Sequence, residues 1–269
     1  MNTIIKPFLR WAGGKSWLIK HLDYLLPKNG FKQYHEPFLG GGSIFLSVKP
    51  QGKYFLSDLN NDLIKTYRVL KNNPNLLINE LKKYKNTEEF YYKIREREPL
   101  DRINLAAKFI YLNQTSFNGI YRVNLKGEYN VPFGYRNKKI LDEENLRSVS
   151  KVLKKATLFH GDFDEARTNI KKGDLVFLDP PYTVSHNRNG FIKYNQKLFS
   201  LEDQHRLSSL IDFIKGKDAY YILTNAAHME ILNIFEKNDK KYELSRANLI
   251  GGINAERGHT TEYIFTNVK

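Results

Sequence analysis

The sequence predicts an α/β fold interrupted by a mostly helical lobe, and two observations support this. First, short apolar runs that end at acidic or turn-forming residues have the pattern of buried parallel strands; they lie at residues 53–58, 156–159 and 174–178. Second, residues 61–150 form a lysine-rich, amphipathic stretch, after which the alternation of strands and helices resumes. We therefore expect an α/β domain made of two separated segments.

Composition excludes several classes of protein. Of the 269 residues, 41% are hydrophobic and 27% charged, which is typical of a soluble globular chain. No apolar run approaches the roughly 18 residues of a membrane span, and the amino terminus lacks the apolar core of a signal peptide. We expect a cytoplasmic protein. The absence of Cys excludes disulfides and thiolate metal sites, and the seven His lack metal-binding spacing, so we expect no metal.

The charge balance favours a polyanionic partner. There are 43 Lys and Arg against 29 Asp and Glu, a formal net charge of +14. Nucleic acid is the simplest such partner. A solvated, lysine-rich surface with no specific partner explains the charge alone equally well.

The first motif is Gly13-Gly14-Lys15, which precedes an apolar-periodic segment that ends near Pro27. Free N–H groups at a helix start, together with the Lys15 ammonium, can hold a carboxylate or phosphate. A P-loop needs a glycine five residues before Gly14, where Leu9 stands, so we reject that assignment. A small carboxylate is the favoured ligand; a glycine-rich entry to a surface helix is the alternative.

The second motif is the triple glycine at residues 40–42, which we interpret as a strand-to-helix turn that a ligand can approach closely. Phe45 occupies the third glycine position of a dinucleotide fingerprint, so a dinucleotide is excluded. The next strand ends at Asp58, where a carboxylate can accept the hydroxyl hydrogens of a ribose. A nucleoside without phosphates, such as S-adenosylmethionine (AdoMet), fits these residues.

Residues 61–148 form the inserted lobe, and residues 1–60 with 149–269 form the α/β domain. Within the lobe, alternation around residues 125–128 predicts a β-hairpin. The aromatic and amide residues of this segment suit a surface that meets bases and phosphates. The alternative is a hairpin that packs only against its own lobe.

After the lobe, Asp162 and Phe163 follow a strand at residues 156–159. They are suited to hold an adenine through one hydrogen bond and one apolar contact. Capping of a short following helix by Asp162 is an equally good interpretation.

The central motif is Asp179-Pro180-Pro181-Tyr182, at the end of the strand at 175–178. Neither proline can donate a ladder hydrogen bond, so the chain leaves the sheet there. The carboxylate and a backbone carbonyl can accept the two hydrogens of an exocyclic amine, while the ring stacks on a base. This set suits an amino-group methyltransferase; a rigid turn after a strand is the alternative.

The remaining segments complete the α/β pattern. We expect a loop over the site at residues 185–195, and two strands that form a terminal hairpin around a flexible loop at 251–258. The two hairpin strands are predicted at 244–250 and 261–266. The other predicted elements are helices at 201–214 and 229–235 and a strand at 220–224.

Taken together, the motifs resemble those of the DNA adenine methyltransferase (Dam) family. Phe38-Leu39-Gly40-Gly41-Gly42 is similar to the family's F-x-G-x-G motif, and residues 179–182 to its D-P-P-Y motif. Residues 8–15 resemble its amino-terminal cofactor motif. The resemblance covers nearly the whole chain.

The resemblance implies a fold and a mechanism. The fold is a seven-stranded, Rossmann-like AdoMet-dependent methyltransferase sheet with helices on both faces, plus a mostly helical DNA-recognition domain that carries a β-hairpin. The reaction is direct transfer of a methyl group to N6 of an adenine flipped out of double-stranded DNA, within GATC or a similar site. The product is S-adenosylhomocysteine, and a restriction endonuclease that acts separately is an expected associate.

The resemblance also assigns roles to residues. Catalysis would involve Asp179, Pro180 and Tyr182. Cofactor binding would involve Trp11, Lys15, Phe38, Gly40, Gly42, Asp58, Asp162, Phe163 and Asp179. DNA binding would involve Phe117 and Asn118 at the gap left by the flipped base, Arg122 at a guanine, Pro132, and Lys139 at a phosphate. Alternatives are an N4-cytosine, RNA or protein-glutamine methyltransferase, or a non-catalytic DNA-binding module.

Overall fold

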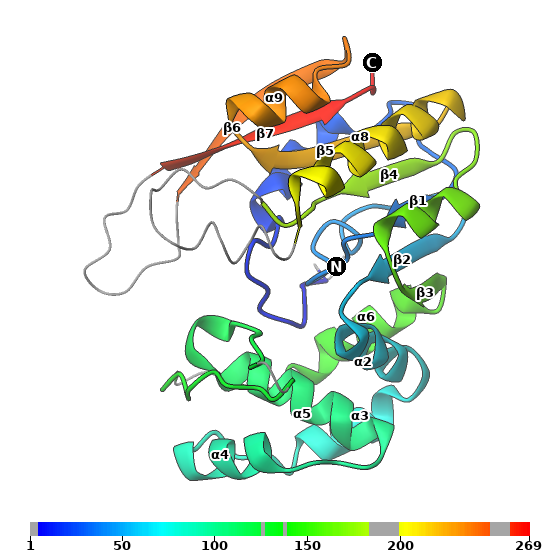
Figure 1. Cartoon of the computed structure of the whole chain (residues 1–269). Helices are drawn as coiled ribbons and strands as arrows, with labels where there is room; N and C mark the ends of the chain where they lie inside the picture. The colour runs from blue at the N-terminus through cyan, green and yellow to red at the C-terminus, as the bar shows by residue number, and fades with distance from the viewer. Residues whose placement is uncertain (1–4, 125–126, 137–138, 183–198, 248–258) are drawn as a thin grey trace. The chain divides into compact units, whose positions relative to one another are not determined.

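The computed structural model describes residues 5–124, 127–136, 139–182, 199–247 and 259–269. Its elements, in chain order, are η1 (Ser16–His21), α1 (Leu22–Leu25), β1 (Tyr34–Glu36), β2 (Tyr54–Asp58), α2 (Asn61–Asn72), α3 (Pro74–Leu81), α4 (Glu88–Glu96), α5 (Arg102–Thr115), η2 (Phe117–Gly119), α6 (Glu143–Leu153), β3 (Ala156–His160), η3 (Phe163–Thr168), β4 (Leu175–Leu178), α8 (Leu201–Gly216), β5 (Tyr220–Ala226), α9 (Met229–Phe235), β6 (Lys240–Ala247) and β7 (His259–Thr266). Figure 1 shows their course.

The described strands form one seven-stranded sheet in the order β3-β2-β1-β4-β5-β7-β6. β1 is parallel to β2 and to β4, and β4 is parallel to β5, whereas β7 runs antiparallel to β5 and β6. The chain proceeds outward from β1 in one direction and from β4 in the other. The strand order therefore reverses between β1 and β4, and the carboxyl ends of strands at such a point are where open α/β sheets bind ligands.

The chain divides into two compact units, each defined by the contacts among its own residues. The first unit comprises residues 1–19, 39–48 and 57–161; the second comprises residues 20–38, 49–56 and 162–269. The predicted domain boundaries at residues 61 and 148 stay a prediction.

In the second unit, α8 and α9 cover one face of the central strands (Figure 1). Alternate residues of β4 and β5, such as Val176 and Leu223, point toward Leu207 and Ile211 of α8 in one buried cluster. All four residues of β4 are buried, which explains why this strand is a continuous apolar run.

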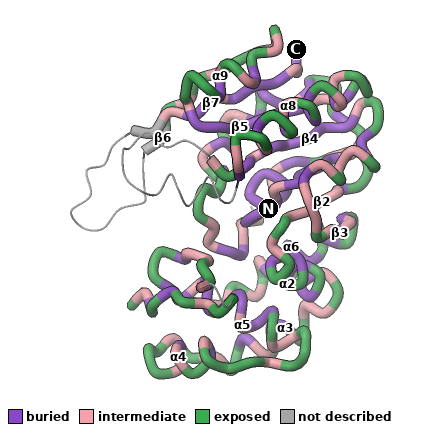
Figure 2. Tube along the Cα trace, in the orientation of Figure 1, coloured by how far each residue is buried: buried purple, intermediate pink, exposed green. Residues whose placement is uncertain are grey.

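In the first unit, the helices pack around α5. Most of α5 is buried (Figure 2), with Ala106, Ala107, Ile110 and Leu112 among the buried residues. The amphipathic stretch that begins at residue 61 starts with two helices, α2 and α3, because Pro74 starts α3 and disfavours a helical backbone at Asn73 before it.

Several predicted elements agree with the structure within one or two residues, including β3, β4, β5, α8, α9 and β7. Three predictions differ or are untested. The triple glycine leads into hydrogen-bonded turns over Gly42–Val48 and not into a regular helix, since Pro50 follows too soon. β6 begins at Lys240, four residues before the predicted start of 244. The loops predicted at 185–195 and 251–258 lie outside the described residues.

Within the described part of the chain, none of the helices has the length and apolar character that crossing a membrane requires.

Candidate active site and nucleic-acid interface

Asp179 follows β4 directly, at the reversal point of the sheet. Its Oδ1 accepts a hydrogen bond of 2.7 Å from Oγ1 of Thr224, a buried residue of β5. β4 and β5 are paired in register with Leu178 opposite Leu223, which brings Thr224 beside Asp179. The carboxylate is thus held at one oxygen by a neighbouring strand, and Pro180 beside it is buried.

Tyr182 is held in a similar way. Its hydroxyl donates a hydrogen bond of 2.5 Å to Oε2 of Glu262 on β7. Glu262 is completely buried, and it lies opposite Ala226 in the antiparallel pair of β5 and β7. A strand near the end of the chain therefore orients the ring that sequence reasoning assigned to base stacking.

The carboxyl end of β1 contributes a second acid and an aromatic cluster. Glu36 is buried, and its Oε2 accepts a hydrogen bond of 2.7 Å from the Tyr34 hydroxyl. Burial raises the pKa of Tyr34 well above its usual value, and Glu36 adds to that effect. Two residues further, Phe38 stacks on Phe163 with ring centroids 5.3 Å apart, while Phe199 packs against both rings.

Asp162 is the N-cap of η3. Its Oδ1 accepts from the Asp164 N–H at 2.9 Å, in a capping box with Glu165. The same oxygen accepts a hydrogen bond of 2.6 Å from Arg206, whose guanidinium lies 4.8 Å from the centroid of the Phe163 ring. The capping interpretation is confirmed, and the adenine-binding role stays a prediction.

In the first unit, the glycine turn is shaped by a tryptophan. Gly40 and Gly42 have φ values of +47° and +68°, which favour glycine. A Cβ atom at Gly40 would lie 2.8 Å from Cδ1 of Trp11, and one at Gly42 would lie 2.8 Å from the Tyr67 hydroxyl. The turn requires glycine because the Trp11 ring and Tyr67 occupy the space of side chains.

Asp58 is tied to the same turn. Its Oδ2 accepts from the Gly40 N–H and its Oδ1 from the Asn60 N–H, both at 2.9 Å. Burial raises the pKa of Asp58 above the usual aspartate value, although the backbone donors oppose that effect. The glycine turn and Asp58 are therefore joined by a hydrogen bond, and the role of Asp58 at a ribose stays a prediction.

Lys15 is buried, with 3% of its surface exposed, and precedes the first residue of η1. Its ammonium donates a hydrogen bond of 2.8 Å to the Gly13 carbonyl, and its backbone N–H donates to the Ser43 hydroxyl at 3.1 Å. The Gly-Gly-Lys segment thus lies at the start of a 3₁₀-helix and contacts the glycine turn through Ser43.

The predicted hairpin is present as two isolated bridges, Ser116 with Phe133 and Val123 with Tyr129. Its tip, residues 125–126, lies outside the described residues. Phe117 is 48% exposed, an unusual exposure for a large apolar ring, and its N–H donates to the Pro132 carbonyl at 2.9 Å. Asn118 is exposed with φ +54°, so both of these predicted DNA-binding residues are accessible to solvent.

Arg122 is exposed and is oriented by a neighbour across the hairpin. Its Nε donates to Oδ1 of Asn130 at 2.8 Å, and one terminal nitrogen donates to the Asn130 carbonyl at 3.4 Å. These contacts engage one edge of the guanidinium, and the other edge carries the remaining donors of the fork. Lys139 is also exposed.

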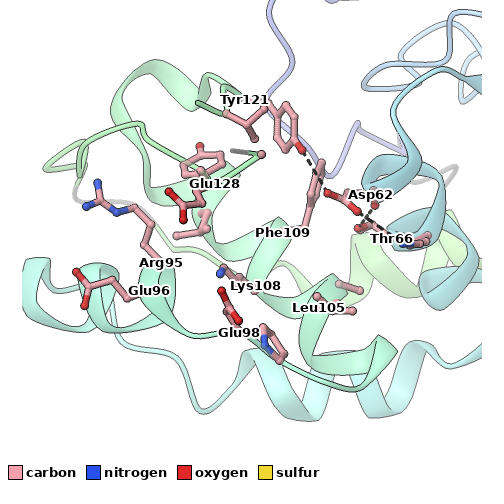
Figure 3. Close-up of a pocket in the computed structure, with 17 residues that line it drawn as sticks. Asp62, Thr66, Arg95, Glu96, Glu98, Leu105, Lys108, Phe109, Tyr121 and Glu128 are labelled. Carbon is pink, nitrogen blue, oxygen red and sulfur yellow. Dashed lines mark hydrogen bonds and ion pairs between the residues drawn. The ribbon is translucent and has the colours of Figure 1, made fainter. Parts of the chain in front are cut away.

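A pocket in the first unit lies between α2, α5 and the hairpin (Figure 3). Its lining combines acids and bases, for example Asp62, Glu98, Arg95 and Lys108, with the rings of aromatic residues. None of the predicted catalytic or cofactor residues lines it. We assign it no part in the reaction.

Sequence reasoning missed the residues that orient the site. Thr224, Glu262 and Asn130 carry no local motif, and pairing between strands brings them to their partners. Among the described residues, no group of three or more His, Cys, Asp and Glu is placed to hold a metal ion.

Comparison with known proteins agrees with this geometry. The family model described as D12 class N6 adenine-specific DNA methyltransferase matches residues 11–248. The chain is 35% identical to the Type II methyltransferase M1.LlaDCHI of Lactococcus lactis subsp. cremoris, over 98% of this chain and 95% of that protein. It is 37% identical to the Type II methyltransferase M.MjaIII of Methanocaldococcus jannaschii, over 84% and 86% respectively. Identity to a DNA adenine methylase of Vibrio cholerae is 33%, over 77% and 76%.

Proposed function

This chain belongs to the D12 class of N6 adenine-specific DNA methyltransferases, and on that premise we propose that it methylates adenine within GATC or a GATC-like site by base flipping. Membership of a methyltransferase family implies AdoMet as methyl donor and DNA as substrate. An associated restriction endonuclease and a cytoplasmic location stay predictions.

The observation that carries the proposal is the arrangement at the end of β4. Asp179 stands at the reversal point of the sheet with one oxygen held by Thr224, and Tyr182 is held by Glu262. Both groups are fixed before substrate arrives, which is the condition for electrostatic catalysis.

We propose the following roles for these residues. Asp179 and the Pro180 carbonyl accept the two amino hydrogens of the flipped adenine, and the Tyr182 ring stacks on the base. As the new bond forms, positive charge grows on N6, and these acceptors stabilise the transition state more than the ground state. Flipping itself costs a few kcal/mol, which stacking on Tyr182 helps to offset.

The residues present fit AdoMet, which supplies an electrophilic methyl group when bound. Asp58 adjoins the glycine turn through the Gly40 N–H, and the Trp11 ring lies against Gly40, so a carboxylate and an indole ring stand beside the turn. We propose that Asp58 accepts ribose hydroxyl hydrogens and that Lys15 pairs with the carboxylate. The further proposed cofactor residues are Trp11, Phe38, Gly42, Asp162, Phe163 and Asp179.

For DNA, we propose that Phe117 and Asn118 enter the gap left by the flipped adenine. Their exposure on the hairpin supports this role. Arg122 would read guanine with the edge that Asn130 does not engage, because a guanidinium fork matches guanine O6 and N7. Pro132 and Lys139 would contact the DNA beside them.

The test is the methylation state of DNA from cells that express the protein, probed with GATC endonucleases that are blocked by, or depend on, methylation. We expect the DNA to resist the endonuclease that methylation blocks and to be cut by the endonuclease that depends on methylation. Asp179→Ala should abolish both effects in a folded protein, whereas the exposed Asp212→Ala should not. Activity of Asp179→Ala within about tenfold of wild type would contradict the catalytic role. Methyladenine found only outside GATC would contradict the recognition sequence alone.

A further inference from the structure

The segment before Trp11 is held by side-chain amides of the first unit. Asn145 of α6 exchanges two hydrogen bonds of 2.9 Å with the backbone of Lys6. Gln114 of α5 donates to the Phe8 carbonyl at 2.7 Å. Asn113 exchanges two hydrogen bonds of 2.7 Å with the backbone of Arg10. We call these three residues the amide ladder; they engage alternate residues of the segment Lys6–Arg10.

Asn113 differs from the other two members because it also contacts the hairpin. It is completely buried, and its second amide hydrogen is donated to the Gly119 carbonyl at 3.1 Å. Gly119 has φ +65°, and a Cβ atom there would lie 2.5 Å from Cβ of Arg10. The Asn113 side chain thus joins the cofactor motif to the base of the hairpin.

Trp11, the next residue, continues this connection through aromatic contacts. Its ring lies on the glycine turn, 2.8 Å from where a Gly40 side chain would begin. On the hairpin side it stacks with Tyr121, with ring centroids 5.9 Å apart and planes 22° apart. Phe109 of α5 packs against both rings, and Figure 3 shows it beside Tyr121.

We propose that Asn113 is a positioning residue shared by the cofactor motif and the recognition hairpin. By holding Arg10 and Gly119 together, it sets Trp11 against the glycine turn and sets the hairpin base at the same time. Cofactor affinity and target discrimination therefore depend on one residue that contacts neither ligand. The inference rests on the proposed roles of the glycine turn and the hairpin.

The test uses Asn113→Asp, which keeps the acceptor for the Arg10 N–H and removes both donors at nearly constant volume. AdoMet affinity is measured by calorimetry without DNA, and discrimination as the ratio of kcat/KM on a cognate duplex to that on single-base variants. We expect the Kd for AdoMet to rise about tenfold and the discrimination ratio to fall about tenfold, since the part-buried Arg10 carbonyl and the buried Gly119 carbonyl lose their donor. Asn145→Ala, at the outer end of the ladder, should leave both within about twofold.

A second pair of variants keeps the test valid if Asn113→Asp does not fold. Tyr121→Leu removes the stack between hairpin and Trp11, and it should weaken AdoMet binding several-fold although Tyr121 lies on the hairpin. Tyr135→Leu removes a tyrosine that is 72% exposed, and this variant should bind AdoMet as wild type does.

Three outcomes would overturn the inference. The first is a loss of AdoMet affinity with unchanged discrimination between duplexes. The second is a loss of discrimination with unchanged AdoMet affinity, and the third is an equal effect of Asn113→Asp and Asn145→Ala. Failure of the proposed function is distinguishable, because wild type would then bind AdoMet normally without methylating adenine at any duplex tested.

Discussion

Tyr182 and Asp179 are held by residues that share no motif with them. Glu262 accepts from the Tyr182 hydroxyl, and Thr224 donates to Asp179. Stacking on a base needs only the Tyr182 ring, so the hydroxyl would be dispensable for that role by itself. The hydrogen bond to a buried carboxylate changes that expectation, since a buried acceptor that loses its donor costs about 1–3 kcal/mol.

Tyr182→Phe should therefore lower the melting temperature and reduce kcat several-fold, rather than being mild. In a Glu262→Gln background the same change should cost less, because a neutral amide tolerates the loss of a donor better than a buried carboxylate. The measurement is a double-mutant cycle of thermal stability and kcat, with the half-buried Tyr263→Phe as the control. Strictly additive effects would show that the two side chains are not coupled.

Asp58 provides a pH-dependent prediction. Burial raises the pKa of this carboxyl, so its protonated form stabilises the folded protein at low pH, and this contribution is lost as pH rises through the folded-state pKa. Ribose hydroxyls need the ionised form as acceptor. AdoMet affinity should thus begin to fall, on acidification, at a pH above the ordinary aspartate pKa of about 3.9.

Calorimetry of AdoMet binding from about pH 8 to about pH 4 measures this effect. Asp58→Asn should bind more weakly and show a flatter pH profile. Identical profiles for the two proteins would place the titrating group elsewhere.

At the scale of elements, α5 connects the two functional parts of the first unit. Its buried face packs the helical lobe, its last turns hold the cofactor motif through Asn113 and Gln114, and its end leads into η2 and the hairpin. Apolar and polar residues are poorly separated around α5, because this helix is buried on most of its sides.

The hairpin provides the second prediction at this scale. Arg122→Ala should cost about 1–3 kcal/mol at the cognate site and relax discrimination at one base pair. Asn130→Ala should reduce discrimination at the same base pair by a smaller factor, because it removes only the hydrogen bonds that orient Arg122. Methylation of a cognate duplex and its single-base variants measures both, with the exposed Arg102→Ala as control. An equal loss on all duplexes would make Arg122 a backbone contact.

At the scale of the whole molecule, the charge of +14 contributes non-specific affinity. Phosphate contacts by Lys and Arg release counterions, so this part of the affinity falls steeply with salt and carries no sequence information. The predicted phosphate contact of Lys139 belongs to this class, in contrast to Arg122.

Lys139→Ala should lower affinity for every duplex by the same factor and reduce the salt slope by about one. Lys172, already paired with Asp218 at 3.0 Å, is the control, and its replacement by Ala should leave the slope unchanged. Binding of both variants to cognate and unrelated duplexes, measured at several salt concentrations, gives the two salt slopes to compare. A loss confined to the cognate duplex would instead make Lys139 a specificity residue.

The sequence by itself determined the features that arise from neighbours along the chain. The continuous apolar run of β4 and its two prolines predict a buried strand that ends at Asp179, because proline has no N–H to donate. The triple glycine predicts a turn, which the structure contains, and the predicted strand ends at Asp58. These local patterns also carry the family resemblance, which the comparison confirmed.

Only the tertiary structure decided which residues orient those motifs. Asn113 contacts a residue 103 positions away, Thr224 one 45 away and Glu262 one 80 away. Likewise, β6 begins earlier than its sequence pattern suggests, because its extent is decided by pairing with β7. A side-chain hydrogen bond between distant segments depends on strand order and register. These are set by burial summed over the whole chain, so no local spacing encodes them.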